Sequence, residues 1–148
     1  MAKSPQLYFD IAATTPIDRD VASLINKITL ENFGNPSSIH SIGQQSHNII
    51  ERSRISISNI LHCKSSEIFF TSGGTESNNI VLKGVLASGD HLITSSYEHP
   101  SVLALSDELK GQGIEVTCIK PNQDGLIEID EIKGALKDNT KLVSIMYV

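Results

Sequence analysis

From about residue 67 onward, segments with the hydrophobic spacing of strands alternate with segments that have the hydrophobic spacing of helices. Apolar positions three and four apart predict helices, and short apolar or alternating runs predict strands. Segments that predict strands are EIFFT, HLITS, IEVTCIK and KLVSIMYV (67–71, 91–95, 114–120 and 141–148). Segments that predict helices lie between them (75–88, 100–110 and 129–137). This alternation predicts an α/β fold, with a mainly parallel sheet flanked by helices.

The first 66 residues follow a different pattern. Helical spacing of apolar residues predicts a helix over 17–31 and a longer one over 39–61, where four isoleucines can share a face. The intervening NFGNPSS is dense in turn-forming residues and predicts a loop. We therefore divide the chain into an N-terminal helical segment, 1–66, and an α/β part, 67–148.

Charge and composition exclude several classes of protein. The net charge is −5 and no run of Lys and Arg occurs, which argues against binding to nucleic acid or to an anionic membrane surface. No apolar stretch approaches the ~20 residues of a membrane span. Asp10 interrupts the apolar residues near the N-terminus, so a signal peptide is not expected. With only two cysteines in the chain, we expect a cytoplasmic protein.

The stretch TSGGTES, residues 71–77, lies where a predicted strand gives way to a predicted helix. The free N–H groups of a helix's first turn bind anions. Gly73 and Gly74 let the backbone approach a phosphate closely, and Thr75 adds a hydroxyl donor. The dinucleotide motif GxGxxG and a lysine after the glycines are both absent, which leaves a monophosphate. The alternative is a bare turn, and Glu76 disfavours an anion unless it points away.

A histidine follows the second predicted strand in SSYEHPS, residues 95–101. Pro100 favours extended geometry at His99, which therefore lies in a loop before a helix. If strands 67–71 and 91–95 are parallel, this loop and the glycines share the carboxyl edge of the sheet, where ligands bind. His99 there could stack on a flat ring or move protons. The alternative is a surface-loop histidine; both features together favour a phosphate-bearing ring.

The other histidines and the cysteines give weaker signals. No histidine pair has compact metal-ligand spacing, so no metal site is expected. Cys118 lies on the predicted inward face of a strand and is interpreted as a buried small hydrophobe. Cys63 could be exposed, but a nucleophilic role is disfavoured. The remaining histidines are His40, His47, His62 and His91.

Five motifs in order resemble one enzyme family. They are YFDIAATTP, FGNPSSIH, FTSGGTESNN, EHPSVL and LVSIMYV (8–16, 33–40, 70–79, 98–103 and 142–148). Together they resemble the N-terminal part of cysteine desulfurases of the NifS/IscS type, in the class V aminotransferase group. The resemblance implies an incomplete large domain of the type I fold of transferases that depend on pyridoxal 5′-phosphate (PLP). Residues 1–66 would then contribute active-site loops, and residues 67–148 the first, truncated part of the PLP-binding domain.

The resemblance also implies residue roles. Gly74 and Thr75 match the pair that binds the PLP phosphate, and His99 matches a histidine that stacks on the pyridine ring and assists proton transfer. Segment 12–16 matches a loop on the substrate side of the site. FGNPSS matches a loop near the same site and the dimer partner. The implied reaction converts L-cysteine to alanine in a homodimer. Its sulfur passes through an enzyme persulfide to a scaffold protein for iron–sulfur clusters, or to tRNA thiolation.

The family's cofactor-anchoring lysine and nucleophilic cysteine match no residue of this sequence. We therefore expect an N-terminal portion of a longer enzyme, inactive as a desulfurase by itself. The resemblance also implies that 67–71 lies across the sheet from the next three strands, without neighbours. Alternatives are a selenocysteine lyase or an aminotransferase of the same group, and a non-enzymatic interaction fragment.

Overall fold

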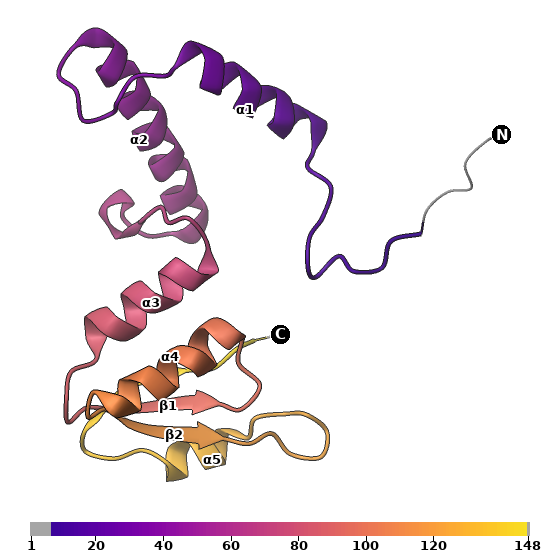
Figure 1. Ribbon diagram of the computed structural model, residues 1–148, viewed down its shortest axis with the longest axis vertical. Helices are drawn as coiled ribbons and strands as arrows, with labels where there is room; N and C mark the ends of the chain where they lie inside the picture. Colours follow the sequence, from indigo (N-terminus) through magenta and orange to yellow (C-terminus); the bar gives the residue numbers. More distant parts are fainter. Residues whose placement is uncertain (1–6, 148) are drawn as a thin grey trace. The chain divides into compact units, whose positions relative to one another are not determined.

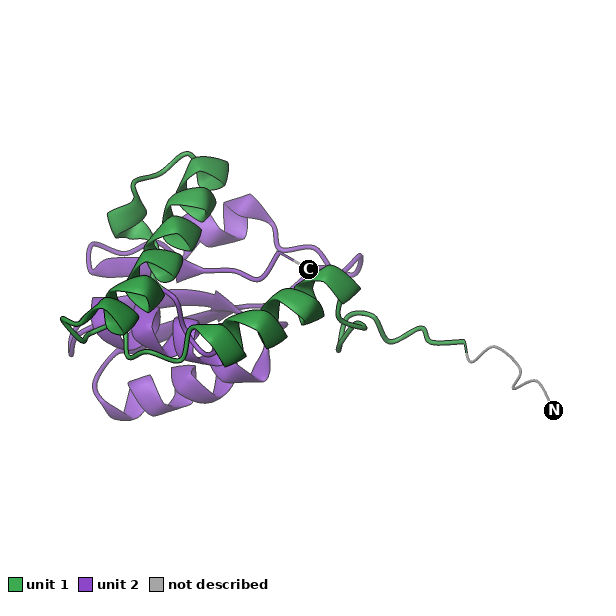
Figure 2. Ribbon diagram, turned by 90° about the horizontal axis from the view of Figure 1, so that it is seen from above, with its two compact units in different colours: residues 1–69 green, residues 70–148 purple. Residues whose placement is uncertain are grey.

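The computed structural model describes residues 7–147, which form two compact units. Unit 1 ends at Phe69 and unit 2 begins at Phe70 (Figure 2). The described part of unit 1 contains two α-helices and a short 3-10 turn. That of unit 2 contains three α-helices and three strands.

In unit 1, α1 (Arg19–Glu31) and α2 (Ser41–Leu61) begin at polar side chains that cap them. The Asp18 carboxylate accepts hydrogen bonds from two N–H groups of the first turn, at 2.8 and 3.3 Å. His40 Nδ1 accepts one from the Gly43 N–H at 3.2 Å. Such caps satisfy N–H groups that have no partner inside a helix. Both helices therefore begin two residues later than the apolar pattern predicts.

The loop between α1 and α2 packs closely against the start of α2. A Cβ added at Gly34 would lie 2.4 Å from the carbonyl oxygen of Ile42. One added at Gly43 would lie 2.6 Å from two carbonyl oxygens of the loop. Both contacts are with backbone, which cannot move aside as a flexible side chain can. The glycines of this motif are therefore required by close packing.

We expect Gly43→Ala to loosen this loop, although replacing a helical glycine by alanine usually stabilises a helix by about 0.5–1 kcal/mol. The added methyl group forces the loop away from α2, so amide hydrogen exchange should quicken in the first turns of α2. The matched control is Gly84→Ala in α3 (Gly74–Val85), where a Cβ meets no atom within 4 Å. That change should slow exchange locally. Slower exchange in α2 of Gly43→Ala would contradict the packing argument.

Unit 1 has little core of its own. Among its described residues no hydrophobic side chain is buried. None of the isoleucines predicted to share a face of α2 is buried, and Ile60 is 75% exposed. Exposed apolar surface of this extent usually contacts another part of a protein or a partner.

Unit 2 is built on a parallel three-stranded sheet. The strands are β1 (His91–Ser95), β2 (Glu115–Ile119) and β3 (Thr140–Ser144), in the order β2–β1–β3. Helix α4 (Pro100–Gly111) connects β1 to β2, and α5 (Ile129–Gly134) connects β2 to β3. Both ladders of β1 are parallel, as crossover connections require. The predicted α/β fold with a parallel sheet is confirmed.

The core of unit 2 lies between the sheet and helices α3 and α4. Figure 1 shows α4 alongside β1 and β2. In register, Leu92 of the central strand lies beside Val116 of β2 and Leu142 of β3. These three pack against a buried cluster on the helices and the following turn. It contains Leu82, Leu86, Val102, Leu105, Leu109 and Ile114.

The strand predicted over 67–71 is wrong. Ser65–Glu67 forms a 3-10 turn, Ile68 is extended, and residues 68–71 belong to no strand. A strand needs hydrogen bonds to a neighbour, and β1 pairs only with β2 and β3 among the described residues. The Arg54 guanidinium instead donates to the carbonyl of Ile68. The apolar residues of this segment were therefore not sufficient to form a strand without a neighbouring strand.

Two further predictions for the strands need correction. Cys118 is exposed rather than buried, because β2 is an edge strand and the core cluster extends over Val116 only. Strand β3 ends at Ser144 instead of running to residue 148, because its partner β1 ends at Ser95. Both errors occur where a strand lacks a neighbour.

Candidate active site

The glycine turn at the start of α3 is open to solvent. Gly73 precedes the helix as its N-cap, and a Cβ added at Gly73 or Gly74 would meet no atom within 4 Å. Thr75 is exposed, and its hydroxyl makes no hydrogen bond within residues 7–147. The first N–H groups of a helix lack intrahelical partners and carry its positive end. Open space, N–H groups and a hydroxyl together fit a phosphate group.

Side-chain hydrogen bonds hold the conformation of this turn. The Thr71 hydroxyl lies 3.2 Å from the Gly73 carbonyl and 2.8 Å from the Ser77 hydroxyl. The Ser77 hydroxyl also donates to the Gly73 carbonyl at 3.3 Å. These bonds use side chains and a carbonyl, so they leave the N–H groups of Gly74 and Thr75 unoccupied.

Glu76 lies in the same turn, and its charge bears on any anion there. Its carboxylate accepts a hydrogen bond from the Ser72 N–H at 2.6 Å. That bond lowers the pKa of Glu76, so the side chain is charged. Because Ser72 precedes the cap residue Gly73, the carboxylate is engaged before the helix begins. The N–H groups of Gly74 and Thr75 therefore stay unoccupied, while the charge of Glu76 in the same turn opposes an anion there.

His99 caps the N-terminus of α4. Its Nδ1 accepts a hydrogen bond from the Ser101 N–H at 3.1 Å and lies 2.8 Å from the Ser101 hydroxyl. A ring nitrogen that accepts from an N–H carries no proton, so the neutral ring of His99 holds its proton on Nε2. The side chain is exposed, as a group that meets a ligand must be.

A hydrogen-bond chain joins the two predicted motifs. Asn78 Nδ2 on α3 donates to the Ser101 hydroxyl on α4 at 2.9 Å, and that hydroxyl contacts His99 Nδ1. Farther along, Lys83 of α3 pairs with Glu108 of α4 at 2.9 Å. The two contacts show that the helices run side by side in the same direction. Their N-termini, with the glycine turn and His99, therefore lie at the same end.

The structure thus brings the two motifs together by a different route from the predicted one. Parallel strands 67–71 and 91–95 were expected to align them, and 67–71 is not a strand. Asn78 and Ser101 were missed as site residues. Their positions inside the two motifs were the available signal, because each lies within one turn or so of a predicted site residue.

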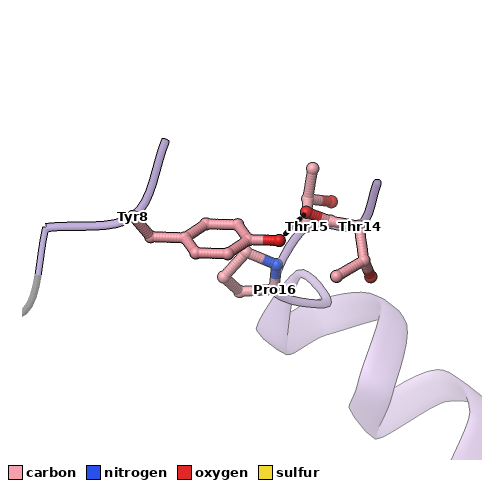
Figure 3. Close-up of a pocket in the computed structure, with 4 residues that line it drawn as sticks. All are labelled: Tyr8, Thr14, Thr15 and Pro16. Carbon is pink, nitrogen blue, oxygen red and sulfur yellow. Dashed lines mark hydrogen bonds between the residues drawn. The ribbon is translucent and has the colours of Figure 1, made fainter. Parts of the chain in front are cut away.

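Segment 8–16 forms a hydrogen-bonded turn in unit 1. The Tyr8 hydroxyl donates to the carbonyls of Asp10 at 2.7 Å and Thr14 at 3.0 Å. Figure 3 shows the Tyr8 ring extending toward Thr14, Thr15 and Pro16, which line a cavity of about 430 Å³ with it. The assignment of 12–16 to the substrate side stays a prediction.

His91 lies at the amino end of β1, away from the candidate site at the carboxyl end. It is fully buried and bonds to Thr140 on β3 through Nδ1 and to Thr117 on β2 through Nε2, both at 2.8 Å. Burial lowers the pKa of His91, Lys137 lowers it further, and Glu115 opposes this. The residue joins all three strands and is structural.

Residues 7–147 contain no group of three or more His, Cys, Asp or Glu side chains placed to hold a metal ion. Cys63 follows the end of α2 and is half-buried.

Among residues 7–147, no helix has both the length and the apolar character needed to cross a bilayer.

Comparisons with known proteins identify the family of this chain. The chain is 42% identical over 146 residues to the cysteine desulfurase IscS of Dictyoglomus turgidum, covering 96% of this chain and 37% of that protein. A solved structure of SspA in complex with cysteine matches with a TM-score of 0.88 and 36% identity, covering 95% of this chain and 42% of that one. A NifS-like protein matches with a TM-score of 0.85 and 33% identity, covering 90% and 38%.

These similarities confirm the predicted fold class, an incomplete large domain of the type I PLP-dependent transferases. The chain spans 37% of the length of the curated relative. Class V aminotransferases depend on PLP, and the open glycine turn with its unoccupied N–H groups fits the phosphate of that cofactor. The model of the aminotransferase class-V family matches residues 7–148. The chain therefore belongs to the aminotransferase class-V family.

Proposed function

We propose that this chain forms the phosphate-binding and ring-facing part of a cysteine desulfurase that converts L-cysteine to L-alanine. The desulfurase relative and the cysteine complex of SspA support this reaction. They favour it over selenocysteine cleavage, transamination or a purely non-enzymatic role.

The hydrogen-bond chain from Asn78 through Ser101 to His99 carries this proposal. PLP holds a phosphate and a pyridine ring on one small molecule, so its binding site needs an anion-binding turn and a ring-facing group close together. The chain of bonds supports such a placement, because it connects the helix that begins at Gly74 to the side chain of His99.

Each residue then has a defined task. N–H groups of Gly74 and Thr75 and the Thr75 hydroxyl bind the phosphate. His99 stacks on the pyridine ring, and its Nε2 holds the proton that the neutral ring carries. PLP, when bound, supplies an electron sink for the substrate's carbon atoms.

We also propose the wider setting of the reaction. A homodimer in the cytoplasm would act on L-cysteine and deliver sulfur to a scaffold protein for iron–sulfur clusters or to tRNA thiolation. The name IscS of the curated relative supports the delivery of sulfur to iron–sulfur clusters. Within this reaction, we assign cofactor binding to Gly74, Thr75 and His99.

Thr75→Val is expected to weaken PLP binding about tenfold, the effect of losing one hydrogen bond to a charged group. Valine keeps the shape of threonine and removes only the hydroxyl. Binding is measured by absorbance titration of the purified chain with PLP and with pyridoxal, which lacks the phosphate. Pyridoxal should bind more weakly than PLP and respond little to the substitution.

The matched control is Thr29→Val on α1, where the hydroxyl bonds only to the Ile25 carbonyl of its own helix. It should leave PLP binding unchanged. Equal affinities of the unmodified chain for PLP and pyridoxal would refute the phosphate site. An unchanged PLP affinity in Thr75→Val would show that the Thr75 hydroxyl does not bind the phosphate.

A further inference from the structure

Glu98 is a buried carboxylate next to His99, with only 7% of its surface exposed. Its Oε1 accepts a hydrogen bond from the Ser95 hydroxyl at 2.7 Å and one from the Met146 N–H at 2.6 Å. No cation pairs with it among the described residues. A buried charge without such bonds would be strongly unfavourable, so these two bonds define where Glu98 lies.

The two partners of Glu98 lie at the carboxyl ends of two different strands. Ser95 ends β1, and Met146 follows the end of β3. Glu98 therefore connects the loop after the central strand to the chain leaving an edge strand. His99 is the next residue of that loop, so its backbone position depends on the same connection.

Both partners also line a cavity of about 450 Å³ at the carboxyl end of the sheet. Its other walls are Tyr97, the turn at 125–127, Ile145 and Tyr147. The Ser95 hydroxyl additionally accepts a bond from the Tyr97 N–H at 3.3 Å. The contacts of Glu98 thus hold together one wall of the cavity as well as the loop of His99.

We propose that Glu98 is a positioning residue that fixes His99 at the carboxyl edge of the sheet by tying its loop to the end of β3. The inference rests on the proposed function for its role in PLP binding. Its structural part concerns the protein without PLP and is testable separately. The carboxylate acts only as a hydrogen-bond acceptor, so an uncharged acceptor of the same shape should replace it.

The test compares Glu98→Ala and Glu98→Gln by NMR of the purified chain without PLP. In Glu98→Ala the imidazole signals of His99 should shift, and amide exchange at Met146 should quicken about tenfold or more, as the loss of a hydrogen bond to a charge predicts. The glutamine oxygen can still accept, so in Glu98→Gln the His99 signals should stay near their unmodified positions. Exchange at Met146 should quicken clearly less than in Glu98→Ala, because a neutral acceptor keeps part of the hydrogen-bond energy. The control Glu131→Ala, at an exposed position on α5, should change neither.

A separate PLP titration distinguishes the two proposals. If the unmodified chain binds no PLP while Glu98→Ala shifts His99, the proposed function fails and the positioning role stands. If Glu98→Ala is folded with unchanged His99 signals and unchanged Met146 exchange, the positioning role is refuted. If Glu98→Ala does not fold, Glu98→Asp decides, since its shorter side chain withdraws the carboxylate from Met146. Unmodified signals in Glu98→Asp would refute the proposal.

Discussion

Replacing Leu92 by alanine is expected to destabilise unit 2 by about 3 kcal/mol, the cost of a leucine-to-alanine change in a close-packed core. Leu92 is fully buried on the central strand. It has a strand on either side and the leucines of α3 and α4 above it, so the surroundings cannot collapse into the cavity left behind. Folded proteins are stabilised by only about 5–15 kcal/mol, so this loss removes a large share.

Urea unfolding followed by circular dichroism measures this effect. The matched control is Leu136→Ala, a leucine of unit 2 whose side chain is 53% exposed. Its unfolding midpoint should move little, because exposed substitutions rarely exceed about 0.5 kcal/mol. Equal midpoints for the two variants would show that the cluster around Leu92 is not the core of the unit.

The stability of unit 2 is expected to fall as the pH drops below about 6.5, the ordinary pKa of histidine. Burial lowers the pKa of His91 in the folded protein. In the unfolded chain the ring keeps its ordinary pKa and takes up a proton first. The stabilisation by neutral His91 is therefore complete above that value, and is lost as the pH falls toward the lowered pKa of the folded state.

Each tenfold difference in proton affinity between the folded and unfolded states changes the free energy of unfolding by about 1.4 kcal/mol. Urea midpoints measured between pH 8 and pH 5 follow this loss. His91→Gln removes the titrating group and should flatten the pH dependence over that range. A dependence as steep in His91→Gln as in the unmodified chain would assign it to other groups.

Two substitutions of threonine by valine in the same sheet sharpen this test. Thr117→Val removes the partner of His91 Nε2 and should cost about 1 kcal/mol. Thr94 on β1 is buried, and its hydroxyl is the one buried side-chain oxygen or nitrogen without a partner among the described residues. Thr94→Val should therefore stabilise the unit by up to about 1 kcal/mol. If Thr117→Val and Thr94→Val changed the free energy of unfolding in the same direction, the hydrogen bonds assigned to His91 would be contradicted.

The sequence predicted the elements of unit 2 well wherever periodicity and pairing agree. HLITS forms a strand over the predicted range because β1 has a neighbour on both sides. EIFFT has the same apolar character but no neighbour, and it does not form a strand. Cys118 was misjudged for a related reason, since alternation along a strand does not show how far the covering helices extend.

The candidate site was predicted only in part. Gly74, Thr75 and His99 were recognisable from their motifs, but the bond between Asn78 and Ser101 joins residues on two separate helices. No local pattern encodes such a contact. The role of Glu98 was equally hidden, because its second partner, Met146, lies far along the chain. Side chains that connect elements distant in sequence were the part that pattern reasoning could not supply.

The position of β1 in the centre of the sheet has a consequence for how the protein is made. The ribosome produces β1 before either of its neighbours, and β3 begins only at Thr140. At about 5–20 residues per second, one edge of the central strand stays unpaired for several seconds during translation. The pace of translation between Ser95 and Thr140 therefore sets how long this edge can pair with other nascent chains before β3 covers it.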